Sequence, residues 1–248
     1  GAFHNVCQHR GHILRDRGTG RCDSFKCPYH DWVWGLDGKL DRVPSRSRFL
    51  EGIPADRRRL PPVTVQDWAG FVWIHIDEPR ETLEEYLGPI FKHVAPYHPE
   101  TFGVGNDWTA TWATNWKCAL DGFNETYHCP ATHPQLGEYC DTLSAEFQFG
   151  RRHSVFTIAH GVRPPSQRDG EVGGLYGEMV RGAGIDTASV AGRPEDLRVG
   201  YQQALRAEAA REGFDYSGLS DEQLTDTHHF FVFPNVHIDF HGATGFTV

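Results

Sequence analysis

Two short loops near the start of the chain carry residues that could bind metal. Cys7 and His9 stand in Cys-Gln-His-Arg-Gly, and Cys27 and His30 stand in Cys-Pro-Tyr-His. Each loop therefore offers one thiolate and one imidazole. A two-iron, two-sulfur cluster needs this donor set when one iron takes both cysteines and the other takes both histidines. Neutral imidazole in place of thiolate lowers the negative charge at that iron and raises the reduction potential.

A structural zinc site is the alternative, because two cysteines and two histidines also suit tetrahedral zinc. Zinc modules usually group two cysteines and then two histidines. Here each loop mixes the two types, with Arg10-Gly11 after the first pair and Pro28-Tyr29 inside the second. This arrangement favours the iron–sulfur cluster.

A second group of candidate ligands lies in the middle of the chain. Asp121, Glu125 and His128 are spaced at i, i+4 and i+7, which places them on one face of a helix predicted over residues 116–128. His133 follows after a proline, and a turn broken by proline can bring its imidazole back towards the first. Two histidines beside acidic groups begin the facial triad of non-haem Fe(II) oxygenases, whose open positions accept O₂. The alternative is an ordinary amphipathic helix with a wet polar face.

These motifs give the chain its resemblance to a known family. The first two loops resemble those of Rieske proteins. His12 and Tyr29 occupy the places where some respiratory-chain members carry disulfide cysteines, so the resemblance is to the ferredoxins and the non-haem iron oxygenases. Asn115-Trp116-Lys117 through His133-Pro134 resembles the iron helix of Rieske oxygenase large subunits, the aromatic-ring-hydroxylating dioxygenase alpha subunits. Phe233-Pro234-Asn235 also resembles the family, so the resemblance covers the whole chain.

The resemblance implies two sets of metal ligands. The mononuclear Fe(II) would be bound by His128 and His133. Its third ligand, an aspartate, is expected beyond this sequence, and Asp239 is not assigned because it lies within a predicted strand. The [2Fe–2S] cluster would be held by Cys7, His9, Cys27 and His30. The strand histidines are expected to lie on the surface or to line a pocket, and they are His228, His229, His237 and His241.

The resemblance also implies roles for the two carboxylates. Glu125 would bridge the metal centres of neighbouring subunits, from His30 of one chain to His128 of the next, because a metal-bound imidazole usually donates its other N–H to a carboxylate. Many ring-hydroxylating members carry aspartate at this position, whereas glutamate occurs in branches that resemble quaternary-amine monooxygenases. Asp121 would have a supporting role.

The elements that position these residues are predicted to form an α+β protein of two domains. Residues 1–79 contain short runs and turn signals, which predict a small antiparallel β Rieske domain. Residues 80–248 predict a larger α+β catalytic domain with an antiparallel sheet. A helix over 82–93 begins with a capping box of Thr82 and Glu85.

Four further elements are predicted in the second domain. Strands are expected over 145–160 and 228–240, and an amphipathic helix over 201–212. Residues 161–194 are rich in glycine, proline and charge, which predicts a long loop that acts as a lid or a disordered insert.

Composition narrows the class of protein. The chain has 248 residues, 39% of them hydrophobic, and a formal net charge of -9. No apolar run is long enough for a membrane span, and the negative charge argues against a nucleic-acid surface. An iron–sulfur cluster fits a reducing compartment, so the protein is expected to be cytoplasmic with its other cysteines free. The chain lacks an initiator methionine and its ends fall in predicted strands, so we expect an internal fragment with both domains truncated.

The function implied by the resemblance is the oxygenase component of a Rieske non-haem iron system. Electrons from NAD(P)H would arrive through a partner reductase, with or without a ferredoxin, because the chain has no Gly-x-Gly-x-x-Gly motif of its own. The iron would activate O₂ and hydroxylate an aromatic or other small organic substrate, as in aromatic hydrocarbon catabolism, by mono- or dioxygenation. The assembly would be a homotrimer or an α₃β₃ complex.

Three alternatives stay open. A monooxygenase or demethylase of quaternary amines would use the same two metal centres. A Rieske electron-transfer protein without oxygenase activity would need neither His128 nor His133. A zinc-binding interaction module would be colourless, whereas a Rieske protein is brown.

Overall fold

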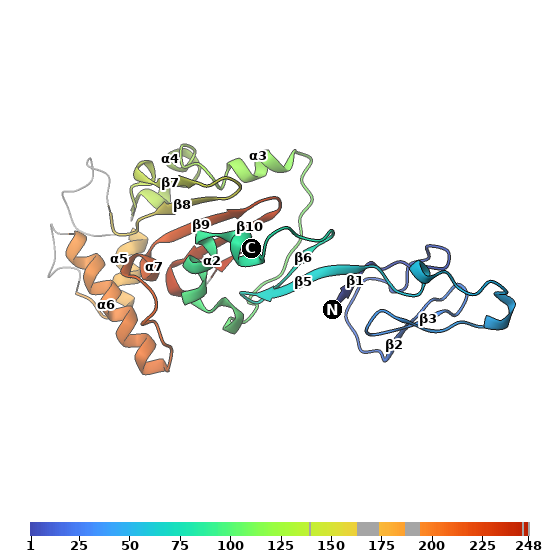
Figure 1. The fold of residues 1–248 in the computed structure, drawn as a ribbon. Coiled ribbons are helices and arrows are strands. Elements are labelled where there is room, and N and C mark those ends of the chain that lie inside the picture. The colour runs from blue at the N-terminus through green and yellow to red at the C-terminus, as the bar shows by residue number, and fades with distance from the viewer. Residues whose placement is uncertain (139, 163–173, 187–193, 245, 248) are drawn as a thin grey trace. The chain divides into compact units, whose positions relative to one another are not determined.

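The chain forms two compact units, Gly1–Tyr86 and Leu87–Val248, and each is described by itself. The division falls within a short helix, whereas the sequence placed the domain boundary after residue 79; where the functional domains divide stays a prediction. The computed structural model (Figure 1) describes residues 1–138, 140–162, 174–186, 194–244 and 246–247.

The first unit consists of short antiparallel strands and tight turns. One sheet has the strand order β1-β5-β6 and the other β2-β3-β4. Bulky apolar residues from both sheets and the intervening loops pack around two buried cysteines, with Trp34 fully buried among them. The elements are β1 (Ala2–Phe3), β2 (Ser24–Lys26), β3 (Val33–Gly35), β4 (Leu40–Arg42), η1 (Arg46–Arg48), η2 (Ala55–Arg57), β5 (Pro62–Trp68) and β6 (Phe71–His75).

The second unit is built on an antiparallel sheet with the strand order β11-β10-β9-β8-β7. The predicted strand over 145–160 is a hairpin of two strands, and the segment 228–240 is another hairpin that turns at the cis Phe233–Pro234 bond. The strands are β7 (Glu146–Phe149), β8 (Ser154–Ile158), β9 (Thr227–Val232), β10 (Val236–His241) and β11 (Phe246–Thr247).

Helices and 3₁₀ turns lie before the sheet and between its hairpins. The helix predicted over 82–93 is two short helices, since Gly88 adopts a positive φ between them, and the capping box of Thr82 and Glu85 is present. The predicted helix 201–212 is longer, and part of the predicted loop 161–194 is helical while its remainder is largely outside the described residues. The α-helices are α1 (Leu83–Leu87), α2 (Pro89–Val94), α3 (Trp116–Asp121), α4 (Cys129–Thr132), α5 (Gly174–Gly182), α6 (Pro194–Glu212) and α7 (Asp221–Thr225). The 3₁₀ turns are η3 (Ala95–Tyr97), η4 (Pro99–Thr101), η5 (Pro134–Glu138), η6 (Thr142–Ser144) and η9 (Gly242–Thr244).

The two faces of this sheet have different partners (Figure 1). Side chains alternate between faces along a strand, so Phe230 and Phe240 point to one side, where Phe240 stacks on Tyr97 just after α2 at 4.1 Å between ring centroids. On the other side, Trp116 of α3 contacts Phe231 at 6.3 Å. The segment that carries the predicted iron ligands therefore begins with a helix that packs on this face of the sheet.

Across the described parts of the chain, no helix is both long and apolar enough to cross a membrane.

Candidate metal centres

The two predicted cluster loops have matching backbone geometry. The backbone N–H of each cysteine donates to the carbonyl of the residue five positions later. The backbone carbonyl of the same cysteine accepts the N–H of the residue four positions later. In both loops the residue four after the cysteine has a positive φ, 73° at Gly11 and 56° at Asp31. The four N···O distances lie between 2.8 and 3.0 Å, for Cys7 to His12, Gly11 to Cys7, Cys27 to Trp32 and Asp31 to Cys27.

These loops bring the four predicted ligands together. The cysteines are 1% exposed, and the rings of His9 and His30 lie 4.6 Å apart at 72°. The Nδ1 atom of His9 is buried without a hydrogen-bond partner among the described residues, while its ring stacks on Trp32 at 4.6 Å. Two buried thiols, two partly exposed imidazoles and an orphaned ring nitrogen fit a two-iron cluster of mixed ligation.

The segment from 116 to 128 is not the continuous helix that the sequence predicted. Asn115 caps α3 by accepting the N–H of Lys117 at 3.0 Å, but the helix ends at Asp121. The Asn124 amide then donates to the carbonyl of Leu120 at 3.0 Å, which satisfies a group that helical continuation would have used. Asp121 is exposed and does not line the cavity described below.

Glu125 and His128 form a local pair. The Glu125 carboxylate contacts Nδ1 of His128 and accepts the backbone N–H groups of Tyr127 and His128. Burial opposes ionisation of Glu125, but the hydrogen bonds from His128 and Tyr127 outweigh it and hold its pKa below the usual range. With Nδ1 engaged, Nε2 is the nitrogen of His128 that can bind a metal.

His133 returns to the same place after the short helix α4. Its N–H donates to the carbonyl of Cys129 at 2.8 Å, and its ring lies 5.3 Å from that of His128 at 75°. The turn predicted to bring the two imidazoles together is therefore present. Together they supply two nitrogen donors, which is the histidine part of a facial triad.

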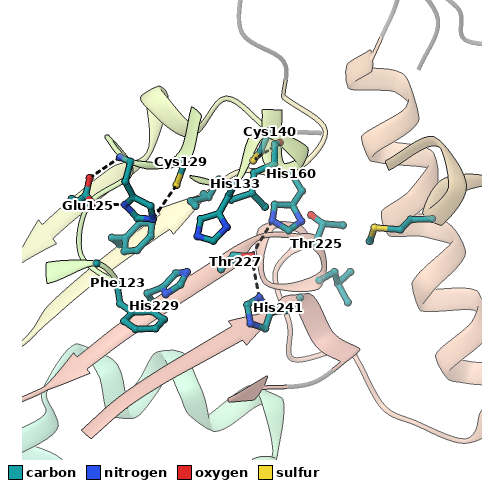
Figure 2. Close-up of a pocket in the computed structure, with 18 of the residues that line it drawn as sticks. Phe123, Glu125, Cys129, His133, Cys140, His160, Thr225, Thr227, His229 and His241 are labelled. Atoms are coloured by element: carbon teal, nitrogen blue, oxygen red, sulfur yellow. Dashed lines mark hydrogen bonds and ion pairs between the residues drawn. The ribbon is translucent and has the colours of Figure 1, made fainter. Parts of the chain in front are cut away.

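A cavity of about 450 Å³ opens beside these residues (Figure 2). Glu125, His128 and His133 line it on one side and the sheet lines it on the other. The apolar lining includes Phe123, Leu136, Phe156, Ile158, Met179 and Tyr201, and the polar lining from the sheet and its neighbours includes His160, Thr225, Thr227, His229 and His241.

Three histidines line the cavity away from the predicted iron ligands: His229 and His241 were expected to lie on the surface or to line a pocket, whereas His160 had no predicted role. His229 and His241 face the cavity, whereas the adjacent His228 faces the core, where its ring lies 4.7 Å from that of His93. Nε2 of His160 lies 2.9 Å from the hydroxyl of Thr227. Burial lowers the pKa of His160 to about 4, so this side chain is neutral at pH 7. Strand alternation marked which histidines share a face, but only the packing shows which face meets the cavity.

Comparisons with known proteins agree with this arrangement. Residues 1–64 match the model of the Rieske [2Fe-2S] domain, and residues 99–248 match that of the ring hydroxylating alpha subunit catalytic domain. The chain belongs to the ring-hydroxylating alpha subunit family. Both predicted metal centres thus lie in the family domain expected to hold them, and the α+β class and the pairing of a [2Fe–2S] cluster with mononuclear iron are confirmed.

Curated relatives in this family include oxygenase subunits of monooxygenases. The carnitine monooxygenase oxygenase subunit of Escherichia coli K12 is 32% identical over 173 residues, which cover 67% of this chain and 44% of the relative. The glycine betaine monooxygenase oxygenase subunit of Chromohalobacter salexigens is 32% identical over 145 residues, which cover 57% of this chain and 32% of the relative. The chain therefore spans less than half the length of these relatives.

Solved structures share the fold. The quaternary ammonium Rieske monooxygenase CntA in complex with L-carnitine superposes with a TM-score of 0.60 at 19% identity, covering 96% of this chain and 49% of the other. Naphthalene 1,2-dioxygenase with indole bound superposes with a TM-score of 0.61 at 21% identity, covering 99% and 54%. Family members with different substrates thus share this architecture.

Proposed function

We propose that this chain is part of the oxygenase component of a Rieske non-haem iron monooxygenase that acts on quaternary ammonium compounds. Its curated relatives are oxygenases of carnitine, glycine betaine and choline. The sequence analysis placed aromatic substrates first. The relatives now favour quaternary ammonium compounds instead. The proposal also includes a reducing compartment such as the cytoplasm, in keeping with six cysteines, all described, that form no disulfide with one another.

The observation that carries the proposal is the contact between Glu125 and His128 beside His133. A carboxylate on Nδ1 fixes the tautomer and orientation of the imidazole and makes its other nitrogen a better metal ligand. Both imidazoles border the cavity in which a substrate would meet the metal. An electron carrier would need neither the pair nor the cavity.

The charge of the cavity favours a cationic substrate. Among the described lining residues Glu125 is the only carboxylate, and none is lysine or arginine. Aromatic rings of Phe123, Phe156 and Tyr201 add faces that attract a quaternary ammonium group by cation–π interaction, worth about 0.5–2 kcal/mol for each well-placed ring.

Each group has a distinct task in this proposal. Iron bound by His128 and His133 would activate O₂. The cluster would deliver the electrons one at a time. These electrons would come from reduced nicotinamide through a separate reductase, with or without a ferredoxin. The Glu125 carboxylate accepts a hydrogen bond from Nδ1–H of His128 and holds the ring in place. Its side chain is still 41% exposed, which leaves room for a second imidazole. We propose that His30 of a neighbouring subunit takes this position in a trimer.

Oxygen consumption with a panel of substrates tests the proposal. The protein, a reductase and NADH are combined with carnitine, glycine betaine or choline, and in parallel with benzoate or naphthalene. We expect consumption coupled to product only with the quaternary amines, and one ¹⁸O atom in the organic products when ¹⁸O₂ is used. Turnover of the aromatic compounds alone, with two ¹⁸O atoms in the product, would contradict the assigned substrate class.

A further inference from the structure

The β9–β10 hairpin places three potential metal ligands together on the cavity-facing side of the sheet. His229 of β9 stands directly opposite Asp239 of β10 in the strand register. His237 lies two residues before Asp239 on the same strand, so alternation directs it to the same face. None of the three belongs to the two centres predicted from the sequence.

The donor atoms of these residues converge. Nδ1 of His229 lies 2.6 Å from Oδ1 of Asp239, and Nδ1 of His237 lies 3.1 Å from the same oxygen. One ligand atom from each residue falls within 4.8 Å of the others. Octahedral coordination at about 2.1 Å separates neighbouring ligand atoms by about 3 Å, and the separations of 2.6 and 3.1 Å at the carboxylate oxygen lie near that value.

The contacts among the three groups leave buried polar atoms unsatisfied. Although Nδ1 of His229 and Oδ1 of Asp239 are close, neither has a hydrogen-bond partner of acceptable geometry within the described structure, and both atoms are buried. Nε2 of His237 is also buried and unpartnered among the described residues.

The three side chains are largely removed from water. The Asp239 residue is 6% exposed, and the side chains of His229 and His237 are 12% and 19% exposed. The other recorded partner of the carboxylate is the Thr247 hydroxyl, 3.5 Å from Oδ2. The two imidazoles beside the carboxylate replace part of its lost hydration, and a bound cation would complete its charge balance.

We propose that His229, His237 and Asp239 bind a divalent transition-metal ion. Two imidazoles and one carboxylate are the donors that Fe²⁺ and Zn²⁺ accept, whereas Mg²⁺ and Ca²⁺ prefer oxygen ligands throughout. Because His229 also lines the cavity, the ion lies at the cavity floor. This site is separate from the predicted pair His128 and His133, which comes from the segment above the sheet.

Cobalt binding tests the site in a protein from which the predicted iron ligands have been removed. The untagged His128→Ala/His133→Ala variant is dialysed against Co²⁺, and bound cobalt is counted by mass spectrometry, which distinguishes it from cluster iron. We expect one Co²⁺ per chain and a higher melting temperature in its presence. A variant that remains folded by circular dichroism but binds no cobalt would overturn the proposal.

Further substitutions in the same background identify the ligands. His237→Ala and Asp239→Asn should each weaken cobalt binding by about tenfold or more. His241→Ala is the matched control, because His241 lies on the same strand and face but outside the cluster, and it should retain the ion. Equal loss in the control would overturn this ligand set.

X-ray absorption at the cobalt edge adds a measurement that needs no substitution within the cluster. Two imidazole ligands should be counted for cobalt bound to the His128→Ala/His133→Ala protein, and a spectrum without imidazole would exclude the site. None of these experiments measures turnover, so they test the proposed metal site independently of the oxygenase function.

Discussion

The carboxylate of Glu125 contacts the ring of His128 and accepts the backbone N–H of the same residue. One side chain thus fixes both the turn that carries a predicted iron ligand and the orientation of that ligand. The pair is local, so it forms without help from another subunit, while the partial exposure of Glu125 leaves it available to one.

Glu125→Gln should separate these two tasks. Glutamine keeps the shape and can accept the backbone N–H groups, but it lacks the charge that favours proton donation from the imidazole. We expect both metal centres to remain and coupled turnover to fall by about tenfold to a hundredfold. Metal analysis and product formation per O₂ consumed measure the two effects. Full turnover by the variant would exclude a role for the charge.

His133→Ala should remove mononuclear iron and leave the cluster. The two predicted centres together hold three irons when loaded, so the variant should hold one iron fewer per chain than the wild type and keep the visible spectrum of the cluster. His75→Ala, at the exposed end of β6, is the control and should not change the iron count. Equal iron in both variants would mean that His133 is not a ligand.

Buried neutral histidines should make stability depend on pH. Burial lowers the pKa of His228 to about 4 from 6.5, and His160 shifts similarly. The unfolded chain therefore binds more protons between these values, so stability is complete above pH 6.5 and is lost as the pH falls towards 4. For His228 the loss at pH 5 is about 2 kcal/mol. Urea unfolding at pH 7 and pH 5 measures it.

The control for this prediction is His228→Asn, which keeps a polar atom near Thr157 but does not titrate. Nδ1 of His228 lies 3.1 Å from the Thr157 hydroxyl. The variant should be less stable at pH 7 but should lose less stability on acidification. The same loss in both proteins would assign the pH dependence to other groups.

The buried ion pair between Arg198 and Asp226 should be needed for folding of the second unit. The side chains are 15% and 2% exposed, and the pair links α6 to the start of β9. Asp226→Asn leaves the guanidinium without its counter-charge and should lower the free energy of unfolding by about 3–5 kcal/mol. Denaturant unfolding checks this value.

An exposed pair provides the comparison. Arg206 and Asp221 lie 2.8 Å apart with side chains 34% and 61% exposed. Asp221→Asn should cost less than about 1 kcal/mol because water screens the charges. Similar losses at the two sites would show that burial does not set the strength of these pairs.

The parts of the fold and site that the sequence predicted are those fixed over short distances. The cluster loops and the return of His133 depend on turns of a few residues, and their types and spacing were visible directly. The helix predicted over 116–128 was wrong because periodicity does not reveal competition from side chains. Asn124 and Glu125 bond to nearby backbone groups and replace helical hydrogen bonds with turns.

The parts that could not be predicted depend on pairing between distant strands. His229 and Asp239 become neighbours only through the register of the β9–β10 hairpin. A slip of one residue would send each to the opposite face, so residue type alone could not show that they meet. The register of the same hairpin also determines that His241 faces the cavity and that His228 faces the core.

The matching hydrogen bonds of the two cluster loops have a kinetic consequence. Cys7 and Cys27 are each clamped from both sides by main-chain groups, independently of flexible side chains. Ligands held this firmly shift little when the charge of a bound cluster changes, so the environment need not rearrange with each electron. We expect the loops to lower the reorganisation energy of electron transfer if the predicted cluster binds here, so that the cluster would cycle rapidly between its oxidised and reduced states.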